Sequence, residues 1–295
     1  DITLIEGTGP QGRITTEDVE KYSENKPKVS PVASKMAEKL NIDLSSIKKD
    51  GRIMKEDILF INKSNEVLEN NHVQKRVPMS NMRKVVSSRM HESWVTSPAV
   101  TFDIKVDTTS LKKIRNALKD VCKVTYTDLL VKIVSKVLLQ FPLLNCSIEG
   151  EELILRNYVN MGIAVALDEG LMVPVIKYSN DMGLEEISRS IKELAQRAKN
   201  NTISMDEVKD GTFTITNIGM YGIESFSPII NQPEVAILGI NKITETPVVV
   251  NGEIVIKPLM NLSLTTDHRA VDGAVAAQFL AKLKLFIEKP EMLFL

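Results

Sequence analysis

The chain has 295 residues, of which 43% are hydrophobic and 25% are charged, values typical of a globular protein with a substantial core. Its 37 lysines and arginines balance 38 aspartates and glutamates, so the net charge of -1 gives no electrostatic reason to expect nucleic acid or an anionic membrane as a partner. With 2 cysteines, 3 histidines and no apolar run of about 18 residues, we expect no disulfide framework, no metal centre and no membrane-spanning segment.

Glycines punctuate the first stretch of the chain, "IEGTGPQGRITTEDV". Gly7, Gly9 and Gly12 form the pattern G-x-G-x-x-G, which is typical of a dinucleotide-binding turn when a long helix and a second strand follow. Here the helix-forming run is short, and "SENKPKVSP" interrupts it. We therefore interpret the glycines as turn residues and not as a phosphate cradle.

A sequence repeat supports that interpretation. The run "QGRITTEDVEKY" aligns without gaps with "DGRIMKEDILFI", so that Arg13 and Arg52 are equivalent, yet the second copy lacks the earlier glycines. A short amphipathic helix that begins at Ser30-Pro31 is predicted before the second copy only. The predicted organisation is an N-terminally shortened unit over residues 1–24, a whole unit over 29–62 and a polar linker over 63–74.

Residues 75–295 alternate between strand and helix patterns. In "VTFDIKVD", the apolar side chains occupy every second position, which predicts a half-buried strand. Further strands are predicted over residues 158–167, 171–178, 211–219, 234–240 and 253–266. Helices are predicted over residues 111–119, 127–142, 183–200 and 274–289. This order predicts one mixed α/β domain.

His268 lies between a predicted strand and the closing helix, in "LSLTTDHRAVDGAVA". Such junctions project side chains into clefts, and an imidazole has the ordinary pKa that proton transfer near neutral pH requires. Asp272 follows in the same run and is suited to orient the histidine or balance its charge. The alternative is that Asp267, His268 and Arg269 form a polar cap at the start of the helix, with Asp272 in its first turn.

Threonines alternate with apolar residues in "GTFTITNIG". The hydroxyls of Thr212, Thr214 and Thr216 should therefore project from one face of a strand, and such a hydroxyl is able to donate a hydrogen bond to an oxyanion. Threonine is also simply a favourable strand residue, and composition alone favours that simpler interpretation. The sequence contains none of the motifs of P-loop nucleotidases, serine hydrolases with a nucleophile elbow or zinc proteases.

Several of these runs together carry a family resemblance. "DHRAVDG" resembles the D-H-R-x-x-D-G signature of the 2-oxo acid dehydrogenase acyltransferases, and "GTFTITNIG", "SPIINQPEVAILGI" and "PEMLFL" match that family in order and spacing over residues 75–295. The units at 1–24 and 29–62 resemble peripheral subunit-binding domains, the first being only the C-terminal part of one. The resemblance implies an α/β (α+β) fold of the chloramphenicol-acetyltransferase type, with a mixed β-sheet and flanking helices.

The resemblance implies a reaction, the transfer of an acyl group between a dihydrolipoyl thiol and coenzyme A. It assigns His268 as the general base and Thr216 as the hydroxyl that stabilises the oxyanion. Asp272 matches the acid of the motif and is expected to hold the local loop or pair with an arginine. By register, Arg115 is expected to contact a phosphate of coenzyme A, and Asn241 its pantetheine arm, although Arg115 is equally typical of a solvated helix residue.

The resemblance also implies an assembly. It places the active site between the subunits of a homotrimer, with His268 and Thr216 from different chains, and joins trimers into a cubic or icosahedral core through the C-terminal "MLFL". The expected partners of the small units are a 2-oxo acid decarboxylase and dihydrolipoamide dehydrogenase. The lipoyl-domain lysine motif is missing from the sequence, so the lipoyl group is expected on a domain not present in this chain. The expected location is the bacterial cytoplasm, or the mitochondrial matrix if the source is eukaryotic.

The stretch "IGMYGIESFSPIINQPE" is more similar to acetyltransferases of pyruvate or acetoin systems than to succinyl or branched-chain enzymes, so acetyl is the expected acyl group. Two alternatives stay open. One is a non-catalytic assembly subunit of the same fold, and the other is a family member with another acyl specificity. A free-standing chloramphenicol-type acetyltransferase is disfavoured, because the tandem docking units argue against it.

Overall fold

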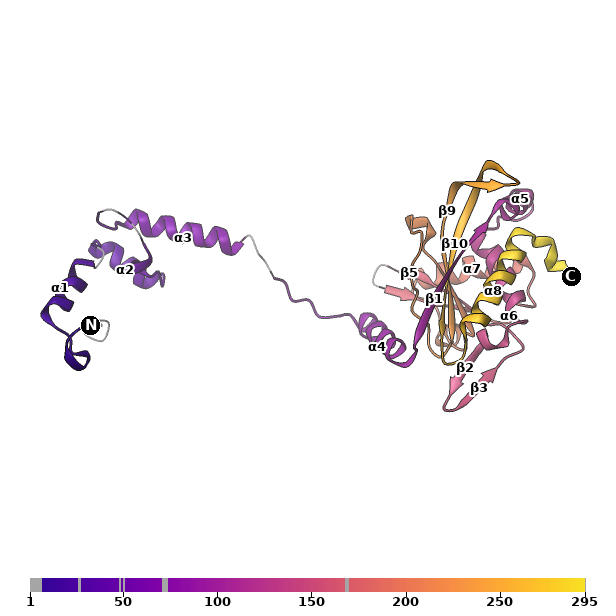
Figure 1. The fold of residues 1–295 in the computed structure, drawn as a ribbon, viewed down its shortest axis with the longest axis horizontal. Coiled ribbons are helices and arrows are strands. Elements are labelled where there is room, and N and C mark those ends of the chain that lie inside the picture. Colours follow the sequence, from indigo (N-terminus) through magenta and orange to yellow (C-terminus); the bar gives the residue numbers. More distant parts are fainter. Residues whose placement is uncertain are drawn as a thin grey trace. The chain divides into compact units, whose positions relative to one another are not determined.

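The computed structural model describes residues 7–25, 28–47, 49, 51–70, 74–167 and 170–294. The chain forms two compact units, Asp1–Pro78 and Met79–Leu295, and each is described by itself (Figure 1). No helix in these described ranges is long and apolar enough to cross a membrane. Residues 1–6 of the first predicted module and Leu295 of "MLFL" lie outside the described ranges.

The first unit is helical. Helix α2 begins where the sequence predicts it, because the Ser30 hydroxyl accepts the N–H of Ala33 at 3.2 Å and Pro31 occupies the first turn. A small core of four buried side chains holds α2 against α3; they are Ala33, Ala37, Ile53 and Ile58. The elements of this unit are η2 (Pro10–Gly12), α1 (Thr16–Asn25), α2 (Pro31–Lys39), η3 (Leu44–Ser46) and α3 (Lys55–Asn70).

The predicted linker over residues 63–74 is wrong in its first part, because α3 continues to Asn70. The run "KSNEVLEN" lacks the apolar period of a packed helix, but it also contains no proline or glycine that would end one. Once packing of Ile58 has fixed the first turns of α3, each further residue adds a backbone hydrogen bond without a new nucleation cost. The loss of an apolar face therefore does not by itself mark the end of a helix.

Both copies of the sequence repeat start a helix with the same contact. The carboxylate of Asp18 accepts the N–H of Thr15 at 2.8 Å, and the carboxylate of Asp57 accepts the N–H of Met54 at 2.8 Å. An acid in the first turn stabilises N–H groups that have no partner within the helix. In the second copy, the Lys49 ammonium lies 2.7 Å from Asp57 and completes the contacts of that acid.

In the first copy, the glycine-rich loop folds against Asp18. The N–H and the hydroxyl of Thr8 donate to Asp18 at 2.9 and 2.7 Å, and these bonds, with those from Thr15, hold the pKa of Asp18 far below its usual range. Gly9 and Gly12 donate their N–H groups to carbonyls of the same loop at 2.9 and 3.0 Å. The loop therefore uses its own N–H groups, as a turn does, and the turn interpretation is confirmed.

A mixed six-stranded sheet organises the second unit, in the order β1-β10-β9-β8-β4-β7. Strand β8 runs parallel to β4 and β9, and the other neighbouring pairs are antiparallel. The strands are β1 (Ala99–Asp107), β4 (Met161–Ile163), β7 (Val175–Ile176), β8 (Phe213–Asn217), β9 (Ala236–Val250) and β10 (Glu253–Asp267). Two further hairpins pair β2 (Cys146–Glu149) with β3 (Glu152–Leu155), and β5 (Val165–Leu167) with β6 (Gly170–Met172).

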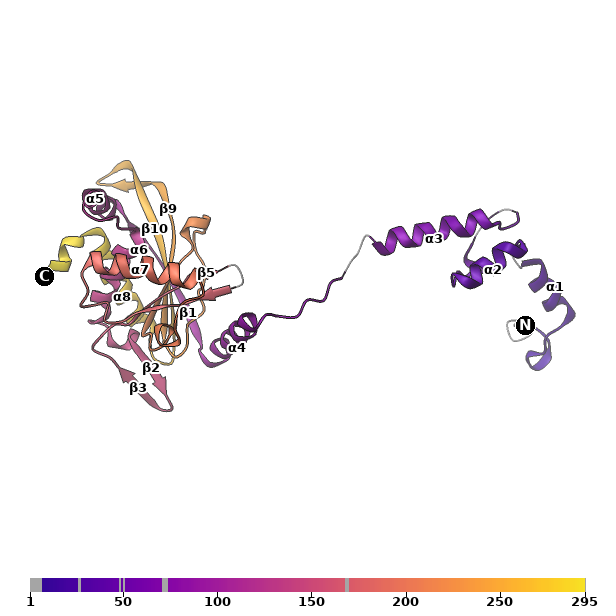
Figure 2. The same ribbon diagram turned by 180° about the vertical axis from the view of Figure 1, so that it is seen from behind.

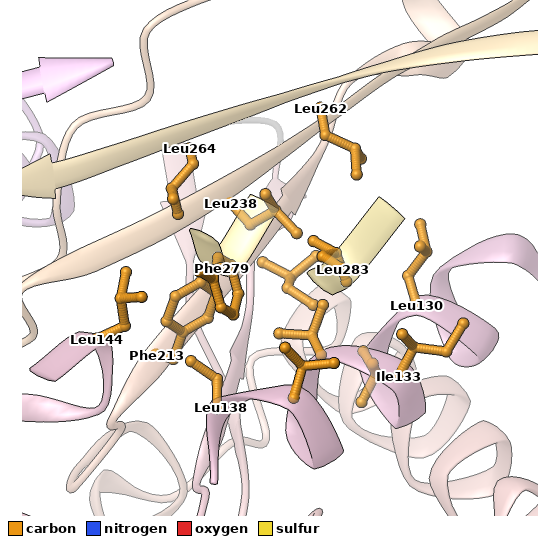
Figure 3. Packing of buried hydrophobic residues seen from close by; sticks show 14 of the residues in the cluster. Leu130, Ile133, Leu138, Leu144, Phe213, Leu238, Leu262, Leu264, Phe279 and Leu283 are labelled. Carbon is orange, nitrogen blue, oxygen red and sulfur yellow. The ribbon is translucent and has the colours of Figure 1, made fainter. Parts of the chain in front are cut away.

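One face of this sheet packs against helices α6 and α8, which also contact each other (Figure 2). Phe213, Leu238, Leu262 and Leu264 of the sheet meet Leu138, Phe279 and Leu283 of these helices in a hydrophobic core (Figure 3). The helices of the unit are α4 (Asn81–Thr96), α5 (Thr109–Ala117), α6 (Tyr126–Leu138), α7 (Leu184–Lys199) and α8 (Gly273–Glu288). The 3-10 turns are η4 (Pro142–Leu144), η5 (Met205–Val208), η6 (Gly219–Tyr221) and η7 (Pro290–Phe294).

The predicted mixed α/β domain is confirmed, with differences in detail. In β1, Val106 is buried and Phe102 is half-buried whereas Asp103 is exposed, as the alternating pattern predicts. The single strand predicted over residues 158–167 is two, because β4 joins the main sheet and β5 leaves it to pair with β6. Helix α4 and the β2–β3 hairpin have no counterpart among the predicted elements.

A buried acid lies just before β9. Glu234 is 2% exposed, and burial raises the pKa of its carboxyl to about 8, although contacts with Thr214 and Asn231 oppose that rise. The Asn231 amide donates to one carboxyl oxygen at 3.1 Å, and the other oxygen has no partner among the described residues. The carboxyl is therefore held neutral at pH 7, as a group in an apolar setting is.

Replacing Ile58 by alanine should unfold the first unit. Ile58 is fully buried in a core of four residues, and a large-to-small change of this kind costs about 2 to 5 kcal/mol, which a unit this small does not survive. Hydrogen exchange followed by mass spectrometry should show rapid exchange confined to residues 28–62 in the I58A protein. The exposed residue Val32 provides the matched control, V32A, and protection equal to wild type in I58A would contradict the prediction.

Replacing Glu234 by glutamine should flatten part of the pH dependence of stability. Because the folded pKa is about 8 against an ordinary 4.5, the stabilisation by neutral Glu234 is complete below pH 4.5 and is lost as the pH rises through about 8. The melting temperature of E234Q relative to wild type should therefore rise between pH 5 and pH 9. The exposed Glu245 gives the control variant E245Q, and parallel curves for E234Q and wild type would show that the carboxyl ionises normally.

Candidate active site

The sheet face opposite the helices carries polar side chains. Strand register places Thr216 of β8 beside Gly239 of β9, Gly239 beside Ser263 of β10, and Ser263 beside Asp103 of β1. Directly paired residues point to the same face of a sheet, so these four residues form one row, here called the polar row. Their sequence neighbours Ile215, Leu238, Leu262 and Leu264 point the other way, into the core.

Hydrogen bonds fix the polar row. The Ser263 hydroxyl donates to Asp103 at 2.5 Å and accepts from the amide of Asn241 at 2.9 Å. Ser225, from the segment that crosses this face, donates to the other carboxylate oxygen of Asp103 at 2.9 Å. Asn241 is 2% exposed, and its Oδ1 has no hydrogen-bond partner in the described part of the chain. A buried acceptor of this kind favours a ligand N–H.

Thr216 is the most accessible of the three alternating threonines in and just before β8. Phe213 and Ile215 of the same strand are fully buried, and Thr212 and Thr214 are buried as well, whereas Thr216 is half-buried. Of the three predicted hydroxyls, that of Thr216 is therefore the one with access to a ligand. The oxyanion role of Thr216 stays a prediction.

His268 lies on a turn that directly follows β10. Its backbone N–H donates to the carbonyl of Pro98 at 3.0 Å, and its side chain is exposed. The carbonyl of Asp267 accepts the N–H groups of Ala270 and Val271 at 3.1 and 3.0 Å, which closes the turn. The imidazole is thus presented to solvent from a fixed backbone.

An ion pair between the buried Asp267 and the more exposed Arg269 secures that turn. The Asp267 carboxylate, 1% exposed, accepts Nε of Arg269 at 3.0 Å and Nη2 at 2.7 Å. Burial alone would raise the pKa of Asp267, but hydrogen bonds from Arg269 and Ser97 outweigh it, so the pKa lies below its usual range and the carboxylate stays charged. Gln232 donates to the Ser97 hydroxyl at 2.7 Å and extends the network to the loop before β9.

Asp272 occupies the N-cap position of α8 and is exposed, but its side chain makes no capping hydrogen bond. The alternative of a polar cap at the start of α8 stays a prediction, because Asp272 precedes the helix, which begins at Gly273, and Asp267 pairs with Arg269. A polar cap does not account for His268, whose side chain is exposed.

His268 and Thr216 do not meet within one chain. Thr216 aligns with Ser263, whereas His268 follows Asp267, which aligns with Ala99 at the end of the sheet. That offset corresponds to roughly 14 Å along the strands and about 10 Å across them. Any site that uses both side chains therefore requires two chains.

The two predicted coenzyme A contacts also lie apart. Asn241 is close to the polar row, whereas Arg115 lies in α5, which follows Asp107 at the opposite end of β1 from the His268 turn. The exposed Arg115 guanidinium lies 5.1 Å from the centre of the Tyr126 ring, a cation–π contact.

A cleft of about 430 Å³ opens beside the start of β1, near the end of β10 that carries the His268 turn. Its walls are mainly apolar, with Trp94, Val100 and Ile229 among the lining residues and Thr101 and Thr265 on its floor. Trp94 is 73% exposed, which leaves a large aromatic surface open to a ligand or a partner.

Sequence reasoning missed Asp103 and Ser263 of the polar row and the ion pair formed by Asp267 and Arg269. A sequence signal for the first two exists, because Asp103 lies between Phe102 and Ile104 and Ser263 lies between Leu262 and Leu264, so that polar and apolar residues alternate. No group of three or more histidine, cysteine, aspartate or glutamate side chains suited to a metal ion occurs among the residues the structure describes.

Known proteins resemble the chain over most of its length. The acetyltransferase component of the acetoin cleaving system of Bacillus subtilis is 38% identical over 281 residues, which are 91% of this chain and 71% of that protein. The succinyltransferase component of the 2-oxoglutarate dehydrogenase complex of Rickettsia felis is 35% identical over 289 residues, 90% of this chain and 71% of that protein. The two identities are too similar to decide between an acetyl and a succinyl group as the acyl group.

Solved structures share the fold. One is a dihydrolipoamide acetyltransferase of Azotobacter vinelandii, studied for the catalytic roles of a serine, a histidine and an asparagine, at 33% identity and a TM-score of 0.75 over 77% of this chain and 97% of that one. Another is the cubic core of a pyruvate dehydrogenase multienzyme complex, at 32% identity and a TM-score of 0.74 with the same coverage of both chains.

Two family models match the sequence. The model described as 2-oxoacid dehydrogenases acyltransferase (catalytic domain) matches residues 71–295, and the model described as e3 binding domain matches residues 27–59. The first match contains the polar row and the His268 turn, and it covers more than half of the chain. The chain belongs to the family of 2-oxoacid dehydrogenase acyltransferases.

Proposed function

We propose that the chain is a dihydrolipoamide acetyltransferase, which moves an acetyl group between a dihydrolipoyl thiol and coenzyme A. The observation that carries the proposal is the exposed His268 on a turn held by the ion pair between buried Asp267 and Arg269. The bonds of the turn fix the backbone of His268 and leave its imidazole exposed for a substrate. Activity of relatives with both acetyl and succinyl groups makes a succinyltransferase the second candidate.

In the proposed reaction, neutral His268 removes the proton from the attacking thiol as its sulfur bonds to the thioester carbon. Negative charge moves onto the carbonyl oxygen, where the Thr216 hydroxyl of a neighbouring chain donates a hydrogen bond. When the carbonyl re-forms, the bond to the leaving sulfur breaks, and the imidazolium returns the proton to that sulfur. No net proton or electron is consumed, so the transfer is reversible.

Asp272 is assigned a positioning role in this proposal. It lies at the N-terminus of α8 with an exposed carboxylate and no cap hydrogen bond, so it remains available to pair with an arginine of the neighbouring chain or to hold the loop. Its charge also favours the imidazolium that forms during transfer.

We assign coenzyme A and the dihydrolipoyl arm to different surfaces of the subunit. The free Oδ1 of Asn241 is suited to accept an N–H of the pantetheine arm, and Arg115 is suited to contact a phosphate of coenzyme A. The dihydrolipoyl arm, which we assign to a domain not present in this chain, is expected to use the apolar cleft beside Trp94. Both arms would then reach His268 and Thr216 from different sides of a subunit interface.

A homotrimer, assembled further into a cubic or icosahedral core, is the proposed quaternary structure. The distal part of the β9–β10 hairpin supports association, because Val249, Ile254 and Ile256 are each more than 70% exposed on one face of it. Isolated apolar side chains are normal on a surface, but a paired ladder of them favours burial against another chain.

We assign docking to the small units. Residues 29–62, most of which match the e3 binding domain model, are proposed to bind the 2-oxo acid decarboxylase or dihydrolipoamide dehydrogenase. Residues 1–24 are proposed to be the C-terminal part of a second such domain, which the shared helix start at Asp18 and Asp57 supports. Residues 75–295 are proposed as the catalytic domain.

Mixing two inactive variants should restore activity. H268A should abolish acetyl transfer from acetyl-CoA to dihydrolipoamide, and T216A should lower its rate by about 10² to 10³. Co-assembled at equal amounts, they should regain roughly a quarter of wild-type activity, because each mixed ring of three has one interface with both residues intact. T212A is the matched control for a buried strand hydroxyl. Full activity of H268A alone, or a mixture no more active than T216A, would refute the shared site.

The chain should not be a monomer in solution. Its mass is 32.9 kDa, and light scattering should give at least three times that value. V249K together with I254K should reduce the assembled mass, because charge on the exposed ladder opposes its burial. The control V32A leaves the hairpin untouched. A wild-type mass equal to one chain would rule out an intersubunit active site.

A further inference from the structure

One aromatic ring lies directly on the polar row. A Cβ placed on Gly239 would lie 2.7 and 2.8 Å from two ring carbons of Phe226, closer than side-chain atoms approach one another. The ring edge therefore rests on the backbone of Gly239, and glycine is needed there for close approach. Gly239 is the register partner of Thr216, so the ring lies beside the residue proposed to hold the oxyanion.

The three residues before this ring are anchored to the sheet. The carbonyl of Ile223 accepts the N–H of Lys242 at 2.8 Å, the carbonyl of Glu224 accepts the amide of Asn261 at 3.0 Å, and the Ser225 hydroxyl donates to Asp103 at 2.9 Å. These bonds tie consecutive residues to β9, β10 and β1. The ring of Phe226 is half-buried, so one side contacts the sheet and the rest faces the open surface. The anchored backbone holds the ring against Gly239 as one wall of this surface.

We propose that Phe226 is a specificity-determining residue that limits the acyl group to one or two carbons. The inference rests on the proposed function, because it takes Thr216 as the oxyanion donor. A carbonyl oxygen within hydrogen-bond distance of Thr216 places the acyl carbon chain a few ångströms from that residue, about the spacing to Gly239 on the next strand. The ring on Gly239 then occupies the space into which a third or fourth acyl carbon would extend.

The expected size of the effect follows from the discrimination that an apolar wall provides. One methylene in such a pocket changes the relative kcat/KM by about 10 to 200 times. Wild-type protein should therefore use acetyl-CoA at least tenfold better than butyryl-CoA or succinyl-CoA, with propionyl-CoA between them. Replacing Phe226 by alanine removes the wall and should raise the ratio of butyryl to acetyl transfer at least tenfold.

The experiment compares acetyl-, propionyl-, butyryl- and succinyl-CoA as donors to dihydrolipoamide, with the full chain in its assembled state. Y221A is the matched control, because Tyr221 is an exposed aromatic residue close by in the sequence and is 69% exposed. F226L serves where F226A does not assemble, and it should shift the same ratio in the same direction by a smaller factor. An unchanged ratio in F226A or, where that variant does not assemble, in F226L overturns the proposal, as does an equal shift in Y221A.

A second pair of variants tests the contact itself. G239A should displace the ring and lower acetyl transfer, whereas F226A/G239A should recover part of it, because without the ring the nearest atom to the added methyl group is the Ser263 carbonyl oxygen at 3.3 Å. Failure of the double variant to exceed G239A would overturn the proposed wall. The proposed function fails separately, when T216A keeps full activity with acetyl-CoA. Loss of activity in T216A together with an unchanged acyl ratio in F226A refutes the size limit alone.

Discussion

The structure depends on a sheet with two unlike faces. In β8, β9, β10 and β1, successive side chains point alternately into a dry core and onto a polar surface, so that Leu262 and Leu264 pack under helices while Ser263 between them holds Asp103. Burial of the apolar face stabilises the fold at about 25 cal/mol per Å², and this fixes the strand register. A shift of register by one residue would turn every hydroxyl of the polar row into the core. The candidate site is thus held in place by the hydrophobic core beneath it.

In the turn after β10, a charged pair and not apolar packing holds the backbone in place. A buried carboxylate is costly unless it is paired, and Asp267 is paired with Arg269 through two guanidinium nitrogens and held by the Ser97 network. Such a pair contributes little net stability compared with apolar packing, but it has a defined geometry. The ion pair therefore fixes the backbone that carries His268.

Prediction from the sequence succeeded where the signal is local to the predicted element. The alternating run of β1 and the serine and proline at the start of α2 are local signals, and both elements are present. It failed where the outcome depends on distant partners: nothing local ends α3 before Asn70, and nothing local separates β4 from β5. In the site, His268 and Thr216 were found through a motif, whereas Asp103 and Ser263 became visible only when register brought the strands together. The G-x-G-x-x-G pattern misleads because it describes a turn, and turns serve many folds.

In the proposed mechanism, the distance between His268 and Thr216 makes catalysis depend on assembly. Since the sheet fixes both residues, no side-chain rotation brings them together within a chain, and a small hinge motion would break the register that the core enforces. In the proposed mechanism the residues meet only where a neighbouring chain supplies the missing half, so the fraction of active sites would follow the fraction of assembled interfaces. Unassembled chains would then be folded but unable to transfer an acyl group. The proposed mechanism would thereby confine thioester chemistry to the assembled protein.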